Sequence, residues 1–544
     1  MSYSPAVISH IASRAIPVLV FVGVLMLVGV TLKDYGVTWD EPPYFHATDL
    51  HMKWLSESME NLGRGELRRS IDDRIIQSNW HWNPYNVPHP PFSRIVSGFA
   101  RDLSAPFLDK FSAYRMGPAL FFALLVIVSY LWMTELFDRA TGLFSALVLV
   151  LIPNLFGYAH IAVTDLPLAS LWFLTAYCFW QGLGSWKWSI VLGVVWGLAL
   201  STKFPALLIP VPLIFWAHLF HRNQYVNNLF AMISIGPIIM VATQPYLWHQ
   251  TGLRIVEFLY EGVSRGYRPE TNFGIYFFNE VLLSSQLPRY YSFFIIGTTT
   301  PEPILFLALV GSLALWWLRA QRSAVILILA NMIFVILMGL MPGAVLHDGV
   351  RQMLSALPFL AALSGVGFFV VSRFVLKHAQ RWNPFKRIAD LEPKLLGLMI
   401  LLFGFGPSLE LYLSHPFQLS YYNGLVGGIH GAYERGLEMT YFMEAISPAF
   451  LRRLNETLPA NATVNASFAT FMIKYYQKEG RLRRDIRIAD GPPFDHLILM
   501  NRRSALTPRE RILINGHAKP FAAITVAGVP LVAAFKLNQL SNSK

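Results

Sequence analysis

The sequence is poor in cysteine and in charged residues. Cys178 is the single cysteine among 544 residues and lies inside an apolar run, which excludes a disulfide framework and a thiol metal site. Charged residues make up 14% of the chain and hydrophobic residues 54%, a balance outside that of soluble globular domains. We therefore expect an integral membrane protein.

Several common motifs are also missing. The chain has no H-E-x-x-H, no Walker pattern and no dinucleotide glycine fingerprint after a predicted strand, so soluble nucleotide cofactors are not indicated. Nothing repeats at a period of 20 to 50 residues, which excludes solenoids. One G-x-S-x-G match, at 262–266, follows a predicted helix, whereas a serine hydrolase needs a strand-to-helix elbow there.

Apolar runs are frequent and long. A hydrocarbon core about 30 Å thick requires roughly 17 to 25 apolar helical residues, and about eleven candidate spans occur, several of them short. They are 16–32, 116–134, 142–159, 166–180, 188–200, 206–220, 229–245, 303–318, 324–341, 353–371 and 395–412. No A-x-A-like cleavage site follows the first run, so we expect it to be retained. The sequence predicts an all-α polytopic membrane domain over residues 1–414.

The positive charges in the short connections predict the orientation of the spans, because Lys and Arg are retained on the cytoplasmic side. With a cytoplasmic N-terminus, the short outer loops hold only Lys203 and Arg351. The inner side then collects Arg14, Arg139, Lys187, Arg222, Arg319, Arg322 and a cluster from Arg373 to Arg387. The net charge of +12 thus requires no nucleic acid as a partner. The loops near 33–112 and 246–300 are expected outside the cytoplasm.

The sequence changes from apolar to mixed after about residue 415. The stretch 455–480 is typical of a helix, a strand and a second helix, whereas "FDHLILMN" and "FAAITVAGVPLVAAFKL" are typical of strands, the latter of a hairpin. We expect residues 415–544 to form a small extracytoplasmic α/β domain.

Polar residues far apart in the sequence fall on the outer face in this topology. They are Asp40, Glu41, His81, His89, His160, Asp165, Lys203, Arg265, Arg268, Arg289, His347, Asp348 and Arg351. Carboxylates and cations on one face are compatible with a proton-coupled transport path, a solvated surface, or a site for an anionic lipid and a hydroxyl nucleophile. For Asp165 alone, the stretch "VTDLPL" is also compatible with an ordinary helix N-cap.

The order of several short motifs resembles that of the GT-C membrane glycosyltransferases. The motifs are "TWDEPPY", "HPPF", "YRMGPAL", "HIAVTDLPLAS", "TKFP", "TTTPEP" and "HDGVRQ", over about residues 15 to 415. The branch that they resemble is that of bacterial relatives of protein O-mannosyltransferases and of the aminoarabinose transferase that modifies lipid A.

This resemblance implies an inverting transfer of a sugar from a polyprenyl-phosphate carrier to a protein or glycolipid hydroxyl, at the outer face of a bacterial inner membrane. It makes Asp40 the candidate base, because a positioned carboxylate that takes the hydroxyl proton accelerates such a step by roughly 10² to 10⁴. Glu41 and Asp165 match further acidic positions of the family and are also candidate catalytic residues. The leaving phosphate needs cations, and the candidates are Lys203, Arg265, Arg268, Arg351 and His89.

Some alternatives stay open at the level of the sequence. In the aminoarabinose branch a lysine is usual where this chain has His89, a weaker phosphate ligand near neutral pH, which argues against that sugar. A divalent metal is possible through Asp40, Glu41 or Asp165, although their spacing is not diagnostic. The main alternative function is a transporter or flippase of a lipid-linked sugar, which would favour ionisable groups near the middle of the bilayer.

Overall fold

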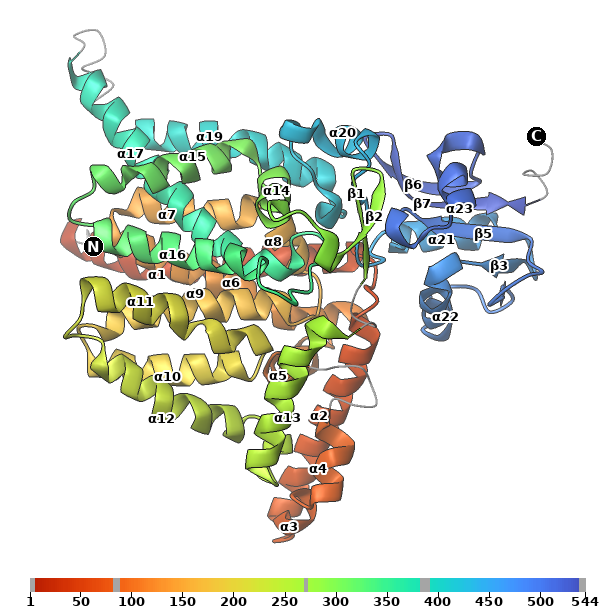
Figure 1. Ribbon diagram of the computed structural model, residues 1–544, viewed down its shortest axis with the longest axis horizontal. Helices are drawn as coiled ribbons and strands as arrows, with labels where there is room; N and C mark the ends of the chain where they lie inside the picture. Colours follow the sequence, from red (N-terminus) through yellow and green to blue (C-terminus); the bar gives the residue numbers. More distant parts are fainter. Residues whose placement is uncertain (1–4, 82–88, 269–272, 382–391, 538–544) are drawn as a thin grey trace.

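A computed structural model describes residues 5–81, 89–268, 273–381 and 392–537. Figure 1 shows a bundle of helices that run roughly side by side and form most of the molecule. The bundle helices are α1 (Pro5–Thr31), α6 (Lys110–Leu136), α7 (Arg139–Leu151), α9 (Asp165–Gly182), α10 (Trp186–Leu200), α11 (Pro210–Phe220), α12 (Val226–Ala242), α15 (Glu302–Leu313), α16 (Arg322–Met338), α17 (Leu357–Arg381) and α19 (Glu392–Ser414). The protein is thus a mostly helical, polytopic membrane protein.

All eleven predicted apolar runs lie on helices, although not always on a single one. Four helical segments of the described chain meet the length and hydropathy of a full membrane span: Ala15–Asp34, Lys110–Leu136, Arg351–Ala379 and Glu392–Ser414. Six shorter apolar helical segments accompany them. One prediction was wrong in detail: the run 142–159 is interrupted, because α7 ends at Leu151 and α8 (Pro153–Tyr158) begins at a proline that cannot continue the helix. The number of membrane crossings stays a prediction.

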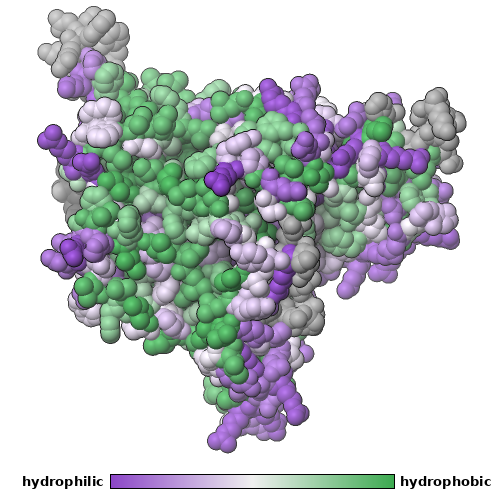
Figure 2. Space-filling view, viewed as in Figure 1, coloured by the Kyte–Doolittle hydropathy of each residue, from purple (hydrophilic) through white to green (hydrophobic). Residues whose placement is uncertain are grey.

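The surface of the bundle is largely apolar in Figure 2, and polar residues gather toward the ends of the molecule. Large hydrophobic side chains such as Phe215 and Phe405 are exposed there, as lipid-facing residues are in a bilayer. Between helices, glycines permit close contact. A Cβ at Gly311 of α15 would lie 2.0 Å from the carbonyl oxygen of Leu363 on α17, so this packing requires a residue without a side chain.

One end of the bundle is covered by elements that cross its axis (Figure 1). From the first long loop come α2 (Glu41–Gly63), α3 (Leu67–Ser70), α4 (Asp73–Trp80) and α5 (Phe92–Ser104), and from the second come α13 (Thr251–Ser264), the hairpin β1 (Gly274–Phe277) and β2 (Glu280–Leu283), and α14 (Tyr291–Thr298). The serine of the G-x-S-x-G match, Ser264, is the last residue of α13, so the elbow of a serine hydrolase is not present at this motif.

A five-stranded sheet lies beyond the same end of the bundle (Figure 1). Its order is β4–β3–β5–β7–β6, with parallel pairing among the first three strands and antiparallel pairing among the last three. The elements of this region are α20 (Gly428–Glu434), α21 (Pro448–Thr457), β3 (Thr463–Asn465), α22 (Thr470–Lys478), β4 (Arg487–Ile488), β5 (His496–Met500), α23 (Pro508–Ile512), β6 (Ala522–Val526) and β7 (Val529–Lys536). The predicted strands and hairpin are confirmed, and the domain boundary at 415 stays a prediction.

Candidate active site

Arg351 lies at the centre of three aspartates that come from distant parts of the chain. Its Nη2 donates to Asp40 Oδ2 at 2.6 Å, and its Nη1 donates to Asp348 Oδ2 at 3.1 Å. Its Nε lies 3.3 Å from Asp165 Oδ2. The guanidinium also lies over the ring of Phe442, 4.6 Å from the ring centroid. One buried cation therefore orients three carboxylates, an arrangement that the planar donor fork of arginine permits.

Asp165 is held by a second cation. Lys203 Nζ donates to Asp165 Oδ1 at 2.7 Å, and both side chains are buried. Asp165 is the first residue of α9, and the cap residue is Thr164, so the interpretation of Asp165 as the N-cap is wrong. Burial lowers the pKa of Lys203, while Asp165 opposes this shift and Arg351 adds to it. The position at the start of α9 thus directs the carboxylate toward two cations.

The backbone at Asp348 explains why a glycine follows it. Asp348 has a φ of 60° and Gly349 a φ of 64°, so two successive residues adopt the left-handed conformation. A Cβ at Gly349 would also lie 3.1 Å from the ring of Tyr441. Burial raises the pKa of Asp348, but His347, Arg502 and Arg351 outweigh burial and hold it below its ordinary value. Asp348 is thus a charged, fixed support for Arg351.

Asp40 differs from the other two aspartates in its exposure. Its side chain is 29% exposed, whereas those of Asp165 and Asp348 are 1% and 0% exposed. Desolvation by the surrounding protein raises the pKa of Asp40. Arg351 opposes this rise, and the negative charge of Asp348 adds to it. Asp40 is therefore the carboxylate of the cluster that an incoming molecule can reach, and it is more basic than an ordinary aspartate.

Glu41 points away from this cluster and is fully buried. Its two oxygens accept hydrogen bonds from Arg115 Nε and Nη2, both at 2.8 Å, and from the backbone nitrogens of Thr38 and Ala162. Arg115 is also bound to backbone carbonyls before Glu41, including that of Gly36 at 2.7 Å. The contacts of Glu41 therefore join the first loop to α6 and to the loop before α9, and they hold the backbone beside Asp40 in place.

The predicted phosphate ligands of the loops form two groups. His89 Nε2 lies 3.4 Å from Arg265 Nη1. The backbone carbonyl oxygen of His89 accepts a hydrogen bond from Arg94 Nη2. Burial lowers the pKa of His89 well below its usual value, and Arg265 and Lys203 lower it further, so the ring is neutral. Arg268 instead donates to Glu261 and to Ser264, both on the preceding helix α13.

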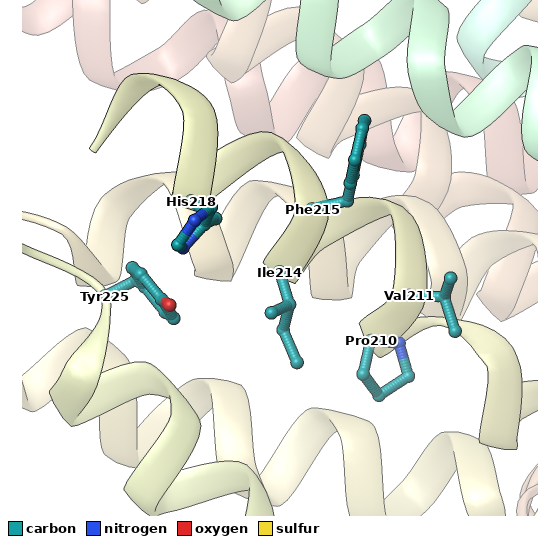
Figure 3. Close-up of a pocket in the computed structure, with 6 residues that line it drawn as sticks. All are labelled: Pro210, Val211, Ile214, Phe215, His218 and Tyr225. Carbon is teal, nitrogen blue, oxygen red and sulfur yellow. The ribbon is translucent and has the colours of Figure 1, made fainter. Parts of the chain in front are cut away.

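A small pocket opens beside the buried part of the cluster. Asp165, Lys203 and Arg351 line one side of it, and Trp172, Val335 and Met338 contribute apolar walls. A second, apolar pocket lies on α11 (Figure 3), where Ile214, His218 and Tyr225 face a common space. No residue of the aspartate cluster lines this second pocket, so it has no direct part in the chemistry of the cluster.

The residues that meet here do not fit a metal site. Among the residues that the structure describes, no group of three His, Cys, Asp or Glu side chains is arranged to hold a metal ion. The oxygens of Asp40, Asp165 and Asp348 are directed to Arg351, and Glu41 is directed to Arg115. The charge that a divalent ion would balance is already balanced by side chains.

Sequence reasoning missed several side chains that complete the site. Arg115 directly precedes the apolar run 116–134, and an arginine at the edge of such a run is a signal, because a buried cation needs a partner. Phe442 and Arg502 lie in the C-terminal region, and no signal in the sequence connects them with Asp40. The convergence of Asp40, Asp165, Lys203 and Arg351 on one face was expected, and their contacts bring them together.

Residues 89–249 match the family described as dolichyl-phosphate-mannose-protein mannosyltransferase. No curated protein matches the chain significantly. Among solved structures, the chain is similar to ArnT from Cupriavidus metallidurans bound to undecaprenyl phosphate, with 15% identity, coverage of 95% of this chain and 97% of that chain, and a TM-score of 0.48. The apo state of the same protein gives 15% identity, coverage of 96% and 98%, and a TM-score of 0.49.

Proposed function

We propose that this chain, a membrane glycosyltransferase of the GT-C type, transfers a sugar from a polyprenyl-phosphate carrier to a hydroxyl of a protein or glycolipid. The observation that supports this most directly is the contrast within one cluster. Asp40 is partly exposed and basic, whereas the cations of the cluster, Arg351 and Lys203, are buried. The description of the family that residues 89–249 match names dolichyl-phosphate-mannose, a sugar on a lipid phosphate, which supports a lipid-phosphate-linked donor.

In the proposed reaction Asp40 acts as the general base. The acceptor hydroxyl oxygen bonds to the anomeric carbon, its proton passes to Asp40 Oδ1 or Oδ2, and the bond from the anomeric carbon to the phosphate oxygen breaks. A single displacement of this kind inverts the anomeric carbon. The raised pKa of Asp40 favours proton acceptance, and a positioned base contributes roughly 10² to 10⁴ in rate.

The leaving polyprenyl phosphate gains negative charge as the glycosidic bond breaks. Cations fixed near it stabilise the transition state more than the ground state, because the charge develops during the step. Lys203, Arg351 and Arg265 are proposed for this role. His89 is neutral, so we propose that it donates a hydrogen bond and does not supply charge. Arg268 is already paired with Glu261 and stays a weaker candidate.

We further propose that the protein resides in a bacterial inner membrane with about eleven spans, a cytoplasmic N-terminus and the site on the extracytoplasmic face. The asymmetry of lysine and arginine in the short loops supports this orientation. The loop elements α2 and α13 and the C-terminal sheet gather at one end of the bundle (Figure 1), so the proposed site and the C-terminal region share a face. Residues 382–391, which end the predicted cytoplasmic cluster of cations, lie outside the described residues.

The test compares envelope glycolipids and glycoproteins by mass spectrometry in cells with the wild type, with a deletion of the whole protein and with Asp40→Asn. Loss of the same sugar mass in the deletion and in Asp40→Asn is expected. If Asp40→Asn retains the sugar while the deletion blocks export of a lipid-linked intermediate, the protein is a transporter and the proposal is wrong.

A further inference from the structure

Arg502 reaches from the C-terminal sheet into the active site. It lies two residues after Met500, the end of β5, and is buried, with 5% exposure. Its Nη1 lies 3.1 Å from Asp348 Oδ1 and also donates to the carbonyl oxygen of Tyr441. The guanidinium lies over the ring of Trp39, 4.4 Å from its centroid. Arg502 therefore contacts both the neighbour of Asp40 in the chain and the aspartate that supports Arg351.

These contacts form a row of alternating charges. Arg502 faces one oxygen of Asp348, and Arg351 donates to the other oxygen at 3.1 Å. Arg351 in turn donates to Asp40 at 2.6 Å. Asp348 Oδ1 accepts no hydrogen bond within the described residues, and Arg502 is the cation that faces this oxygen, whereas His347 and Arg351 face Oδ2. A buried carboxylate without that cation attracts the next cation more strongly.

We infer that Arg502 is a positioning residue, which neutralises Asp348 and thereby leaves Arg351 directed at Asp40. This inference rests on the proposed function of Asp40 as the base. It gives the C-terminal region a part in the catalytic geometry. The same region is also hydrogen-bonded to the segment before Asp40, because the backbone nitrogen of Trp39 donates to the carbonyl oxygen of Phe442 at 3.1 Å.

The charges around each member of the row determine whether loss of Arg502 raises or lowers the pKa of Asp40. Asp40 interacts electrostatically with Arg351, Asp348 and Asp165, and also with Tyr44 and Arg265. Asp348 faces His347, Arg351 and Arg502, and Arg502 faces Asp348, Glu438 and Glu444. Removing the charge of Arg502 leaves a net negative charge near Asp40 and draws Arg351 toward Asp348. Both changes make Asp40 harder to ionise, so the base is protonated up to a higher pH.

The experiment measures transfer from a polyprenyl-phosphate sugar by the full-length protein in detergent between pH 4 and 9, approximately, with thermal unfolding of each variant. Arg502→Met is expected to move the acidic limb of kcat/KM upward by about one pH unit, the lower end of what a nearby charge produces. Arg502→Lys keeps the charge and is expected to show a smaller shift. In Arg502→Met with Asp348→Asn the uncompensated carboxylate is gone, so the limb is expected to return toward that of the wild type.

Arg503→Met is the matched control. Arg503 Nη1 donates to the carbonyl oxygen of Tyr433, and its backbone nitrogen donates to Glu438, so it connects the same segment without contacting Asp348. We expect Arg503→Met to lower the melting temperature and leave the acidic limb unchanged.

An unshifted acidic limb in a folded Arg502→Met would show that Arg502 only attaches the C-terminal region, and the inference would be wrong. If Arg502→Met does not fold, the double variant decides, because a limb displaced upward in it also contradicts the inference. Absence of transfer by the wild type overturns the proposed function instead, so the two failures are distinguishable.

Discussion

Arg351 Nη2 donates to Asp40 Oδ2 at 2.6 Å across 311 positions of sequence. The pair combines the only partly exposed aspartate of the cluster with a cation that is shared among three carboxylates. Because Arg351 is shared, its attraction for Asp40 alone is weakened, and burial prevails in setting the pKa of Asp40. The pairing therefore fixes the direction of the carboxylate without removing its basicity.

Replacement of the base tests the assignment directly. Asp40→Asn keeps the size of the side chain and removes the proton acceptor, so we expect kcat to fall by roughly 10² to 10⁴. The rate of sugar transfer from a polyprenyl-phosphate donor is the measurement. Asp102→Asn is the control, because Asp102 is half exposed and pairs with Arg101 beside it. A wild-type rate for Asp40→Asn would exclude it as the base.

The pH dependence follows from the sign of the shift at Asp40. The base must be ionised, so activity is lost as pH falls through its pKa, and burial places that pKa above the ordinary aspartate value of about 3.9. Arg351→Met removes the main charge that opposes the rise, so its acidic limb is expected about one to three pH units higher. Arg351→Lys retains the charge and is expected to show a smaller shift. A limb at the same pH in all three proteins would contradict the pairing.

Lys203 and Asp165 are expected to act as one unit. Lys203→Met and Asp165→Asn each break a buried contact of 2.7 Å, and the double variant removes both partners. We expect the loss in kcat/KM for the donor to be less than additive, with a coupling of about 0.5 to 3 kcal/mol. The exposed pair Lys474 and Asp490 is the matched control, with an expected coupling of about 0 to 1 kcal/mol in unfolding free energy. If the losses in kcat/KM for Lys203→Met and Asp165→Asn are additive, the two residues act independently and this prediction is wrong.

Glu41 is expected to affect stability more than chemistry. Glu41→Gln leaves the Arg115 guanidinium buried without its counter-charge, which costs about 3 to 5 kcal/mol of unfolding free energy. Thermal unfolding in detergent checks this, and Glu57→Gln in the exposed pair with Lys53 is the control. An unchanged melting temperature together with lost activity would instead support the sequence-based prediction that Glu41 is catalytic.

The sequence predicts the helices better than it predicts what connects them. Apolar runs identify the bundle, and the mannosyltransferase family that residues 89–249 match agrees with the resemblance of the motifs to membrane glycosyltransferases. The cations Lys203 and Arg351 were identified because charges are rare in short outer loops. The roles of the site residues themselves stay predictions.

Arg115 and Arg502 show what a single sequence does not reveal. The partner of Arg115 lies 74 positions away on another element, so the pair depends on how the helices pack. Arg502 and Arg503 are adjacent and of the same type, yet only Arg502 faces Asp348, because the chain direction after β5 decides which side chain points to the bundle. Asp165 was compatible with two roles, and its position after the cap residue Thr164 together with its contact with Lys203 separates them.

The residues of the aspartate cluster lie far apart in the chain, so they are synthesised at different times. Asp40 emerges from the ribosome long before the loop that carries Arg351, and Arg502 emerges later still. A nascent chain thus holds its acidic loop without the cations that orient it, and the turn at Asp348 has no Arg502 to face. The contacts of the cluster are therefore complete only after the C-terminal sheet has been synthesised.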